Sequence, residues 1–248
     1  MYLNVITSYP KSGNTWLRFI IFELFFKEFT KDNSSMNIEI FIPDIHKIHS
    51  NKKIIFDQRL QGKKKFIKSH FEYQKFINSN IDKVILVIRN PLDILASLIN
   101  YYNIKKENID NAVNHFAKYH TFLSLKKDFN FPSWNKHIES WLNSGQDIIT
   151  IRYSDLINDF DSTLKKVTHF FNIDIDKNRI QQIKQNTSFN SLLNLELKEK
   201  KENIDGLFKS NFRKSNFINK GKNNYYLEVF NSSQIEKLKE SFSKDIKK

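Results

Sequence analysis

Residues 3–16, LNVITSYPKSGNTW, decide the fold because they combine a short apolar run, a turn and the start of a helical pattern. The run at 3–7 has the length and composition of a buried strand. The turn carries a lysine and a glycine, as a phosphate-binding loop does. It is not the usual nucleotide loop G-x-x-x-x-G-K-[ST], because Lys11 precedes the only glycine of the turn. The stretch therefore predicts a strand–turn–helix unit whose turn is a candidate anion site.

Similar apolar runs and helical patterns alternate along the rest of the chain, which is typical of a parallel sheet with crossover helices. We predict strands at 3–7, 65–68, 84–88 and 148–151, and helices at 15–29, 92–102, 111–127, 134–143, 160–171, 177–185 and 233–246. The polar segments 30–62 and 195–224 are expected to form surface lids. The fold class is therefore α/β: a single P-loop-like domain over residues 1–248, with a central parallel sheet flanked by helices.

Composition narrows the class of protein. The 248 residues are 40% hydrophobic and include 23 phenylalanines, which is enough for a sizeable core. Cysteine is absent, so thiolate chemistry and disulfides are excluded. The formal charge of +13 favours an anionic partner, although solvated lysines on ordinary helix faces explain it equally well. No signal-peptide pattern or long apolar stretch is present, so we expect a cytoplasmic protein without stable membrane insertion.

The turn after the first strand offers several groups that bind phosphate. Lys11 supplies charge, Ser12 and Thr15 supply hydroxyl donors, and Gly13 permits close approach of the backbone. Helix N-termini at this edge of a parallel sheet bind anions through their unpaired N–H groups. Trp16 offers a flat face for a purine. The alternative is an ordinary connection with a tryptophan in the core.

A second cluster follows the third predicted strand. Arg89 ends that strand, where a buried strand has no structural need of a charge. Asn90 and Pro91 then match the preferences for a helix N-cap and first helical position. Ser97 lies eight residues beyond Arg89, on the helix, where it could face the same side. An arginine and a serine beside a lysine-bearing turn predict a ligand with two separate phosphate groups.

These motifs resemble those of sulfotransferases that use 3′-phosphoadenosine 5′-phosphosulfate (PAPS). YPKSGNTW resembles the family's 5′-phosphosulfate loop, and RNPLDILASLINYY its 3′-phosphate motif. Four further pieces, FIKSHF, IRYSDL, NTSF and FINKGK, resemble other family segments and occur in the family's order. The resemblance implies sulfuryl transfer with PAPS as donor, the bisphosphate PAP as product and no metal.

The resemblance also implies roles for individual residues. The catalytic residues would be His70, Lys11 and Lys68. The residues that bind the nucleotide would be Lys11, Ser12, Gly13, Asn14, Thr15, Trp16, Arg89, Ser97, Tyr153, Thr187, Ser188, Phe189, Asn219, Lys220 and Gly221. Asn219 stands where the family typically has arginine, and residues 224–226 replace its usual Gly-Asp-Trp. The family's dimer motif is mostly absent, so the oligomeric state stays open.

His70 is the candidate general base, because an imidazole has an unperturbed pKa of about 6.5, close to the working pH. His70 also follows the end of the predicted strand 65–68, near the Lys11 turn. Lys68 would neutralise charge on the sulfuryl oxygens. His46 and His49 are spaced like a metal pair, but without further ligands they are interpreted as surface or acceptor-pocket residues.

Two other functions compete with sulfuryl transfer. One is an ATP- and Mg²⁺-dependent phosphotransferase, against which the missing G-K-[ST] ending counts. The other is a non-catalytic module that binds nucleotide or RNA through its positive charge. We expect no nucleic-acid partner. The acceptor is expected to be the hydroxyl or amine of a small molecule or carbohydrate, with a preference for a carbohydrate or natural-product hydroxyl.

Overall fold

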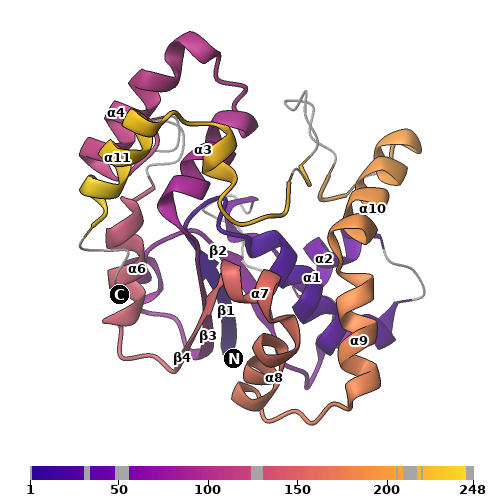
Figure 1. Ribbon diagram of the computed structural model, residues 1–248. Helices are drawn as coiled ribbons and strands as arrows, with labels where there is room; N and C mark the ends of the chain where they lie inside the picture. The colour runs from indigo at the N-terminus through magenta and orange to yellow at the C-terminus, as the bar shows by residue number, and fades with distance from the viewer. Residues whose placement is uncertain are drawn as a thin grey trace.

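Four parallel strands form the centre of the protein, as seen in a computed structural model that describes residues 2–30, 34–47, 56–123, 131–204, 206–208, 217–218 and 220–243 (Figure 1). The strands are β1 (Leu3–Ser8), β2 (Phe66–Ser69), β3 (Ile81–Ile88) and β4 (Ile148–Arg152), in the order β2-β1-β3-β4. Ile6 of β1 lies opposite Lys68 of β2 and Ile85 of β3. The predicted α/β class with a parallel sheet is confirmed, and the carboxyl ends of all four strands share one edge.

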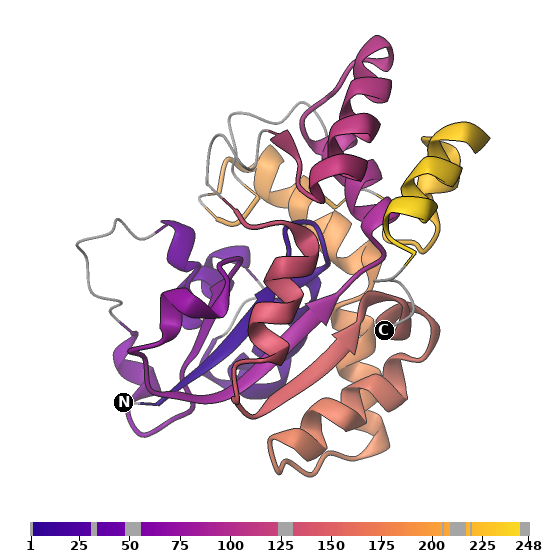
Figure 2. The same cartoon turned by 90° about the vertical axis from the view of Figure 1, so that its left-hand side faces the viewer.

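One face of the sheet is covered by α-helices that pack onto a phenylalanine-rich core (Figures 1 and 2). Ile6, Ile85 and Ile149 point into this core, where Phe25 and Phe66 approach within 4.9 Å between ring centroids. The helices are α1 (Asn14–Phe25), α2 (Ser35–Phe41), α8 (Phe160–Phe170), α9 (Lys177–Asn186) and α10 (Phe189–Lys201).

The opposite face packs on α6 (Trp134–Leu142), whose Trp141 is fully buried against Val5, Val84 and Leu86. Beyond it, three helices form a second apolar cluster near the carboxyl edge of the sheet. They are α3 (Pro91–Tyr101), α4 (Ile109–Tyr119) and α11 (Ser232–Ser241). Short α7 (Tyr153–Asn158) follows β4 directly. None of the described helices is long and apolar enough to cross a membrane.

Several helix predictions need correction. The predicted helix 15–29 ends at Phe25 and continues as a separate 3₁₀ turn, η1 (Lys27–Phe29). The predicted helix 111–127 begins at Ile109 and ends at Tyr119, because His120 adopts a left-handed conformation with φ of 51°. Helices α2, α7 and α10 were not predicted. They are short or strongly charged, so their apolar periodicity is weak, and tertiary contacts stabilise them instead.

The two segments expected to be lids contain regular structure in their described parts. Segment 30–62 includes α2, η2 (Ile45–Lys47) and η3 (Gln58–Leu60), and segment 195–224 begins within α10. The remaining 3₁₀ turns are η4 (Tyr73–Phe76), η5 (Lys106–Asn108) and η6 (Tyr225–Glu228). Buried glutamates anchor α10 despite its few apolar residues: Glu199 accepts hydrogen bonds from the N–H and hydroxyl of Ser35. These segments are therefore built into the walls above the sheet edge.

Candidate functional site

A cavity of about 420 Å³ lies at the carboxyl ends of β1, β2 and β3. Most of the residues expected to bind the nucleotide or act in catalysis line it: Lys11, Gly13, Asn14, Thr15, Trp16, Lys68, His70, Arg89, Ser97, Tyr153, Thr187, Phe189, Lys220 and Gly221. Ser12 is fully buried outside this lining, and Ser188 caps α10 by accepting from the N–H of Ser191. Asn219 lies outside the described residues.

The turn after β1 has two left-handed residues, Lys11 with φ of 67° and Gly13 with φ of 98°. They reverse the chain so that α1 begins at Asn14, with its N-terminus at the sheet edge. The first N–H groups of a helix have no partner within it, which makes this end suited to an anion. A side chain at Gly13 would place its Cβ 2.4 Å from the Tyr153 ring, so only glycine allows this close packing.

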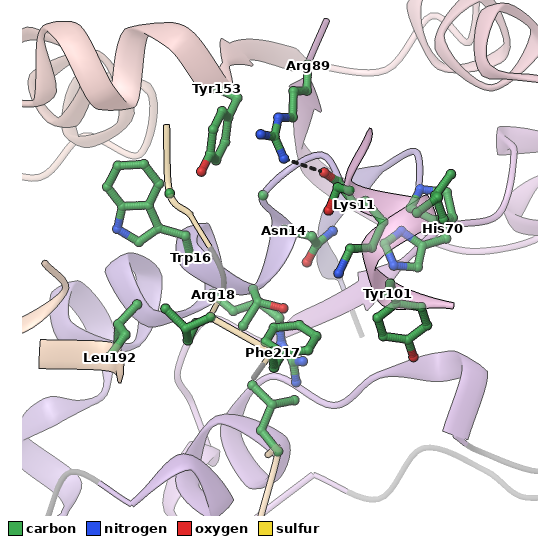
Figure 3. Close-up of a pocket in the computed structure, with 18 of the residues that line it drawn as sticks. Lys11, Asn14, Trp16, Arg18, His70, Arg89, Tyr101, Tyr153, Leu192 and Phe217 are labelled. Carbon is green, nitrogen blue, oxygen red and sulfur yellow. Dashed lines mark hydrogen bonds between the residues drawn. The ribbon is translucent and has the colours of Figure 1, made fainter. Parts of the chain in front are cut away.

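Arg89, at the end of β3, joins this turn to the C-terminal segment. Its guanidinium donates to the carbonyl oxygen of Lys11 at 3.1 Å and to that of Lys222 at 3.3 Å (Figure 3). The guanidinium also lies 4.2 Å from the centre of the Tyr153 ring. Its buried Nε has no hydrogen-bond partner in the structure. The two motifs thus meet at one place, and Arg89 keeps an unsatisfied donor there.

The segment around Gly221 is held against the start of α3. The buried carboxylate of Asp93 accepts from the N–H groups of Asn224 and Tyr226, each at 3.1 Å. Gly221 has φ of 58°, and an added Cβ would lie 2.3 Å from the Phe189 ring. The sequence assigned no role to Asp93, which lies in the first turn of α3. Its burial beside a chain segment 131 residues away could not be seen from that position.

Aromatic rings form one end of the cavity. Trp16 meets Tyr153 edge-on at 5.8 Å between ring centroids, and its indole N–H donates to the carbonyl oxygen of Thr187 at 2.8 Å. Figure 3 shows Trp16 and Tyr153 at one end of the view, and His70 and Tyr101 at the other. The cavity therefore has a flat apolar end on one side and titratable groups on the other.

His70 is held in one tautomer. Its Nδ1 lies 2.6 Å from the carbonyl oxygen of Ser8. Because a carbonyl oxygen can only accept, Nδ1 carries the proton and Nε2 keeps a lone pair. Burial, with Lys68 and His46 nearby, lowers the pKa of His70 well below its usual value. The imidazole is therefore neutral near pH 7 and able to take up a proton at Nε2.

The ammonium of Lys11 lies between two aromatic rings. It is 4.5 Å from the centre of the Tyr101 ring and 4.8 Å from that of Phe217. Such rings stabilise a cation through their negative faces and exclude water around it. The charge of Lys11 is thus placed at the cavity between its two ends (Figure 3).

Lys68 forms a buried ion pair. Its Nζ lies 2.8 Å from Oδ2 of Asp44, a residue to which the sequence analysis gave no role. Burial lowers the pKa of Lys68 to about 8, although Asp44 opposes this shift. Burial raises the pKa of Asp44, but the charge and hydrogen bond of Lys68 and the charge of Arg18 outweigh it and hold that pKa well below its usual range. Lys68 is charged at neutral pH, with its charge already partly compensated.

Arg18 is a second buried cation that sequence reasoning missed. It donates to Glu39 at 3.3 Å and to the carbonyl oxygens of Ile38 and Ile42. A single arginine within the apolar helix 14–25 was an available signal. Of the two histidines spaced like a metal pair, His46 lines the cavity and His49 lies outside the described residues. Among the described residues, no group of three His, Asp or Glu side chains could hold a metal ion.

Comparison with known proteins gives a consistent family. A family model described as "Sulfotransferase domain" matches residues 4–248. Sulfotransferase 2A2 of Rattus norvegicus is 26% identical, over 96% of this chain and 82% of its own length. The amine sulfotransferase of Oryctolagus cuniculus is 24% identical, over 75% of this chain and 62% of its own.

Two solved structures share the fold with a TM-score of 0.69 each. Mouse sulfotransferase SULT7A1 complexed with PAP is 24% identical, covering 98% of this chain and 83% of its own. Retinol dehydratase in a complex with retinol and PAP is 14% identical, covering 99% of this chain and 81% of its own.

Proposed function

This chain belongs to the sulfotransferase domain family, and we propose that it transfers a sulfuryl group from PAPS to a small-molecule acceptor. The observation that carries the proposal is the meeting of the Lys11 turn and Arg89 at one cavity that also contains His70. One donor with a 5′-phosphosulfate and a 3′-phosphate accounts for both cationic groups. The PAP bound to mouse SULT7A1 is the bisphosphate that remains when such a donor has lost its sulfuryl group.

The residues lining the cavity give the donor a direction. The N-terminus of α1 and Lys11 would hold the 5′-phosphosulfate, and Arg89 with Ser97 and Lys220 the 3′-phosphate. The adenine would lie at the aromatic end formed by Trp16 and Tyr153. When bound, PAPS supplies an activated sulfuryl group, and the sulfur would face the end that contains His70.

The reaction is an in-line displacement at sulfur. Nε2 of His70 takes the proton of the acceptor hydroxyl while the acceptor oxygen forms a bond to sulfur. The bond between sulfur and the bridging oxygen breaks, and PAP leaves with the electron pair. Lys11 stabilises the charge that develops on the leaving oxygen, as a fixed cation in a partly desolvated site can. Lys68 contributes charge near the sulfuryl oxygens.

Apart from the residues assigned to the nucleotide, the cavity lining includes many apolar and aromatic side chains, namely Leu98, Tyr101, Tyr102, Phe131, Leu207, Phe217 and Ile218. Rings and aliphatic groups bind flat apolar molecules and offer few partners for a polyhydroxyl surface. The sequence favoured a carbohydrate or natural-product hydroxyl, and of these two this lining favours an apolar alcohol or phenol, or else an amine, over a carbohydrate. The relative named an amine sulfotransferase is consistent with either nucleophile.

The two competing functions receive no support from this geometry. A Mg²⁺-dependent kinase needs carboxylates near the terminal phosphate, whereas Asp44 is already paired with Lys68. An RNA-binding surface needs exposed stacking rings, whereas Trp16 and Tyr153 pack edge-on against each other in the lining of the cavity. Metal independence and a cytoplasmic location remain predictions, and the oligomeric state stays open.

A screen of PAPS consumption against hydroxylated and amine acceptors tests the proposal. Aromatic phenols, apolar alcohols, amines and sugars form the panel, with ATP plus Mg²⁺ as the donor control and a chelator in parallel reactions. We expect PAP formation with at least one acceptor, unaffected by the chelator and absent in His70→Ala, which still binds PAP. Failure to bind PAP more tightly than AMP would contradict the donor assignment.

A further inference from the structure

The chain before η2 adds a short fifth element to the sheet beside β2. β2 is the first strand in the order β2-β1-β3-β4, so β1 pairs with only one of its sides. On the other side the N–H of Lys68 donates to the carbonyl oxygen of Pro43 at 2.9 Å, and Asp44 and Lys68 form a parallel bridge. Residues 43–46 therefore run along β2 toward the same edge as His70.

Asp44 fixes the end of this added segment. Its Oδ2 accepts from Nζ of Lys68 at 2.8 Å, and its Oδ1 accepts from the N–H of His46 at 3.0 Å. One carboxylate thus connects the β2 side chain to the backbone that carries His46. Because both contacts are largely buried, the position of His46 is set by the sheet and not by solvent-exposed chain.

The imidazole of His46 reaches across to the residue that follows β2. Its Nε2 accepts from the backbone N–H of His70 at 2.7 Å. The ring also packs on Phe71, with 4.0 Å between centroids, and meets Phe131 edge-on at 5.1 Å. An imidazole nitrogen that accepts from an N–H needs a lone pair, so the proton of His46 lies on Nδ1.

We infer that His46 is a positioning residue for His70: its Nε2 holds the His70 backbone so that the base points at the acceptor. This inference rests on the proposed sulfuryl transfer. Ser8 holds the ring of His70 from β1, and His46 holds its backbone from the opposite side. The two neighbouring histidines, whose ring centroids are 5.5 Å apart, therefore have different roles.

His46 is not placed to act as a second base. A base needs a lone pair that is open to the acceptor, and the only lone pair of this tautomer is used by the His70 N–H. Burial, with Lys68 nearby, lowers the pKa of His46 to about 4, which keeps the imidazole neutral and able to accept near pH 7. If His46 were protonated, its Nε2–H would face the backbone N–H of His70, and this hydrogen bond would be lost.

Kinetics of two matched variants test the role. His46→Phe keeps a flat ring but has no acceptor, whereas His46→Gln retains an acceptor oxygen. With PAPS and naphthol as substrates, we expect His46→Phe to lower kcat by about 10- to 100-fold, the cost of misplacing a reacting group by up to about 1 Å. The dissociation constant for PAP should stay within about two-fold, because His46 lies at the acceptor end. His46→Gln should recover most of kcat, and substitution of the exposed His169 on α8, His169→Gln, serves as the unaffected control.

Two kinetic results would overturn the inference: an unchanged kcat in His46→Phe, or an equal loss in His46→Phe and His46→Gln. The second result would mean that ring packing, and not the acceptor, matters. Thermal melting of each variant shows whether it is folded before its rate is interpreted.

Nuclear magnetic resonance gives a readout that needs neither activity nor a variant that folds. Long-range proton–nitrogen spectra of the isotope-labelled chain report the tautomer of each histidine ring. We expect His46 and His70 both to carry the proton on Nδ1, and observing it on Nε2 of His46 would refute the contact. If no acceptor is sulfated, the proposed function fails while this spectrum still decides the positioning contact.

Discussion

The guanidinium of Arg89 donates a hydrogen bond to the carbonyl oxygen of Lys11, 78 residues earlier, at 3.1 Å (Figure 3). This contact joins the ends of β1 and β3, which are neighbours in the sheet. Because the same guanidinium also contacts Lys222, one side chain sets the spacing between the turn and the C-terminal segment. The site is therefore prepared for a ligand that extends between them.

Replacing Arg89 with alanine should weaken binding of PAP by about 1.5–3 kcal/mol, the range for hydrogen bonds to charged groups. Isothermal titration calorimetry measures the affinity. Arg152→Ala is a matched control, since Arg152 ends the next strand, is exposed and does not line the cavity. Equal affinities of Arg89→Ala and the parent chain would remove Arg89 from the nucleotide site.

Gly13→Ala should destabilise the fold and weaken PAP binding, because the new methyl group would lie 2.4 Å from the Tyr153 ring at a φ of 98°. Gly145→Ala separates the two causes, since Gly145 has φ of 72° and no atom within 4 Å of the added Cβ. In Gly145→Ala we expect the left-handed backbone alone to lower the free energy of unfolding by about 1–2 kcal/mol. In Gly13→Ala we expect a larger decrease. Guanidinium denaturation of both variants measures the difference. A smaller loss at Gly13 would show that the packing on Tyr153 is not tight.

Lys68→Met should lower the free energy of unfolding by about 3–5 kcal/mol, because it leaves the Asp44 carboxylate buried without its cation. Adding Asp44→Asn should restore a large part of that stability, since the remaining amide is neutral. A double-mutant cycle by chemical denaturation gives the coupling between the two residues. Additive effects would indicate that the pair contributes little to folding.

The pH dependence of kcat/KM for PAPS should reflect the lowered pKa of His70. Burial favours the neutral imidazole, so the base stays available below its ordinary pKa. Between about pH 7.5 and about pH 6 we expect no fall, whereas an unperturbed imidazole would lose roughly four-fold. Initial rates across this range provide the test, with circular dichroism at each pH to verify the fold. A half-maximal rate near pH 6.5 would contradict burial of the base.

Glu196→Gln should loosen the segment that carries Phe217. The fully buried carboxylate of Glu196 accepts from the N–H groups of Phe217 and Ile218 at 2.6 and 2.7 Å. Glutamine has one acceptor oxygen, so one of the two N–H groups loses its partner. We expect this loss to lower the free energy of unfolding by about 1–3 kcal/mol.

Chemical denaturation and PAP titration measure the effect, and exposed Glu202→Gln on the same segment of chain is the control. Indistinguishable results for the two glutamates would show that the Glu196 contacts do not hold this wall of the cavity.

Local sequence was sufficient for the four strands and for helices α1, α3, α6, α8 and α9, but not for α2, α7 and α10. Short runs of four or five residues marked all four strands, and Asn90 caps α3 by accepting from the N–H of Leu92, as its place before Pro91 predicted. These features depend on neighbours in the chain, so they can be read without knowing the fold. Motif order likewise indicated the family before any geometry was known.

Only the tertiary structure decided how the charged groups of the site are paired. The partner of Lys68 lies 24 residues away, that of Arg89 78 residues away, and Glu196 accepts from backbone 21 residues on. The tautomer of His70 and the function inferred for His46 depend on Ser8 and on a bridge beside β2. Such contacts form only when the sheet brings distant segments together, because no local pattern constrains which polar atoms are buried side by side.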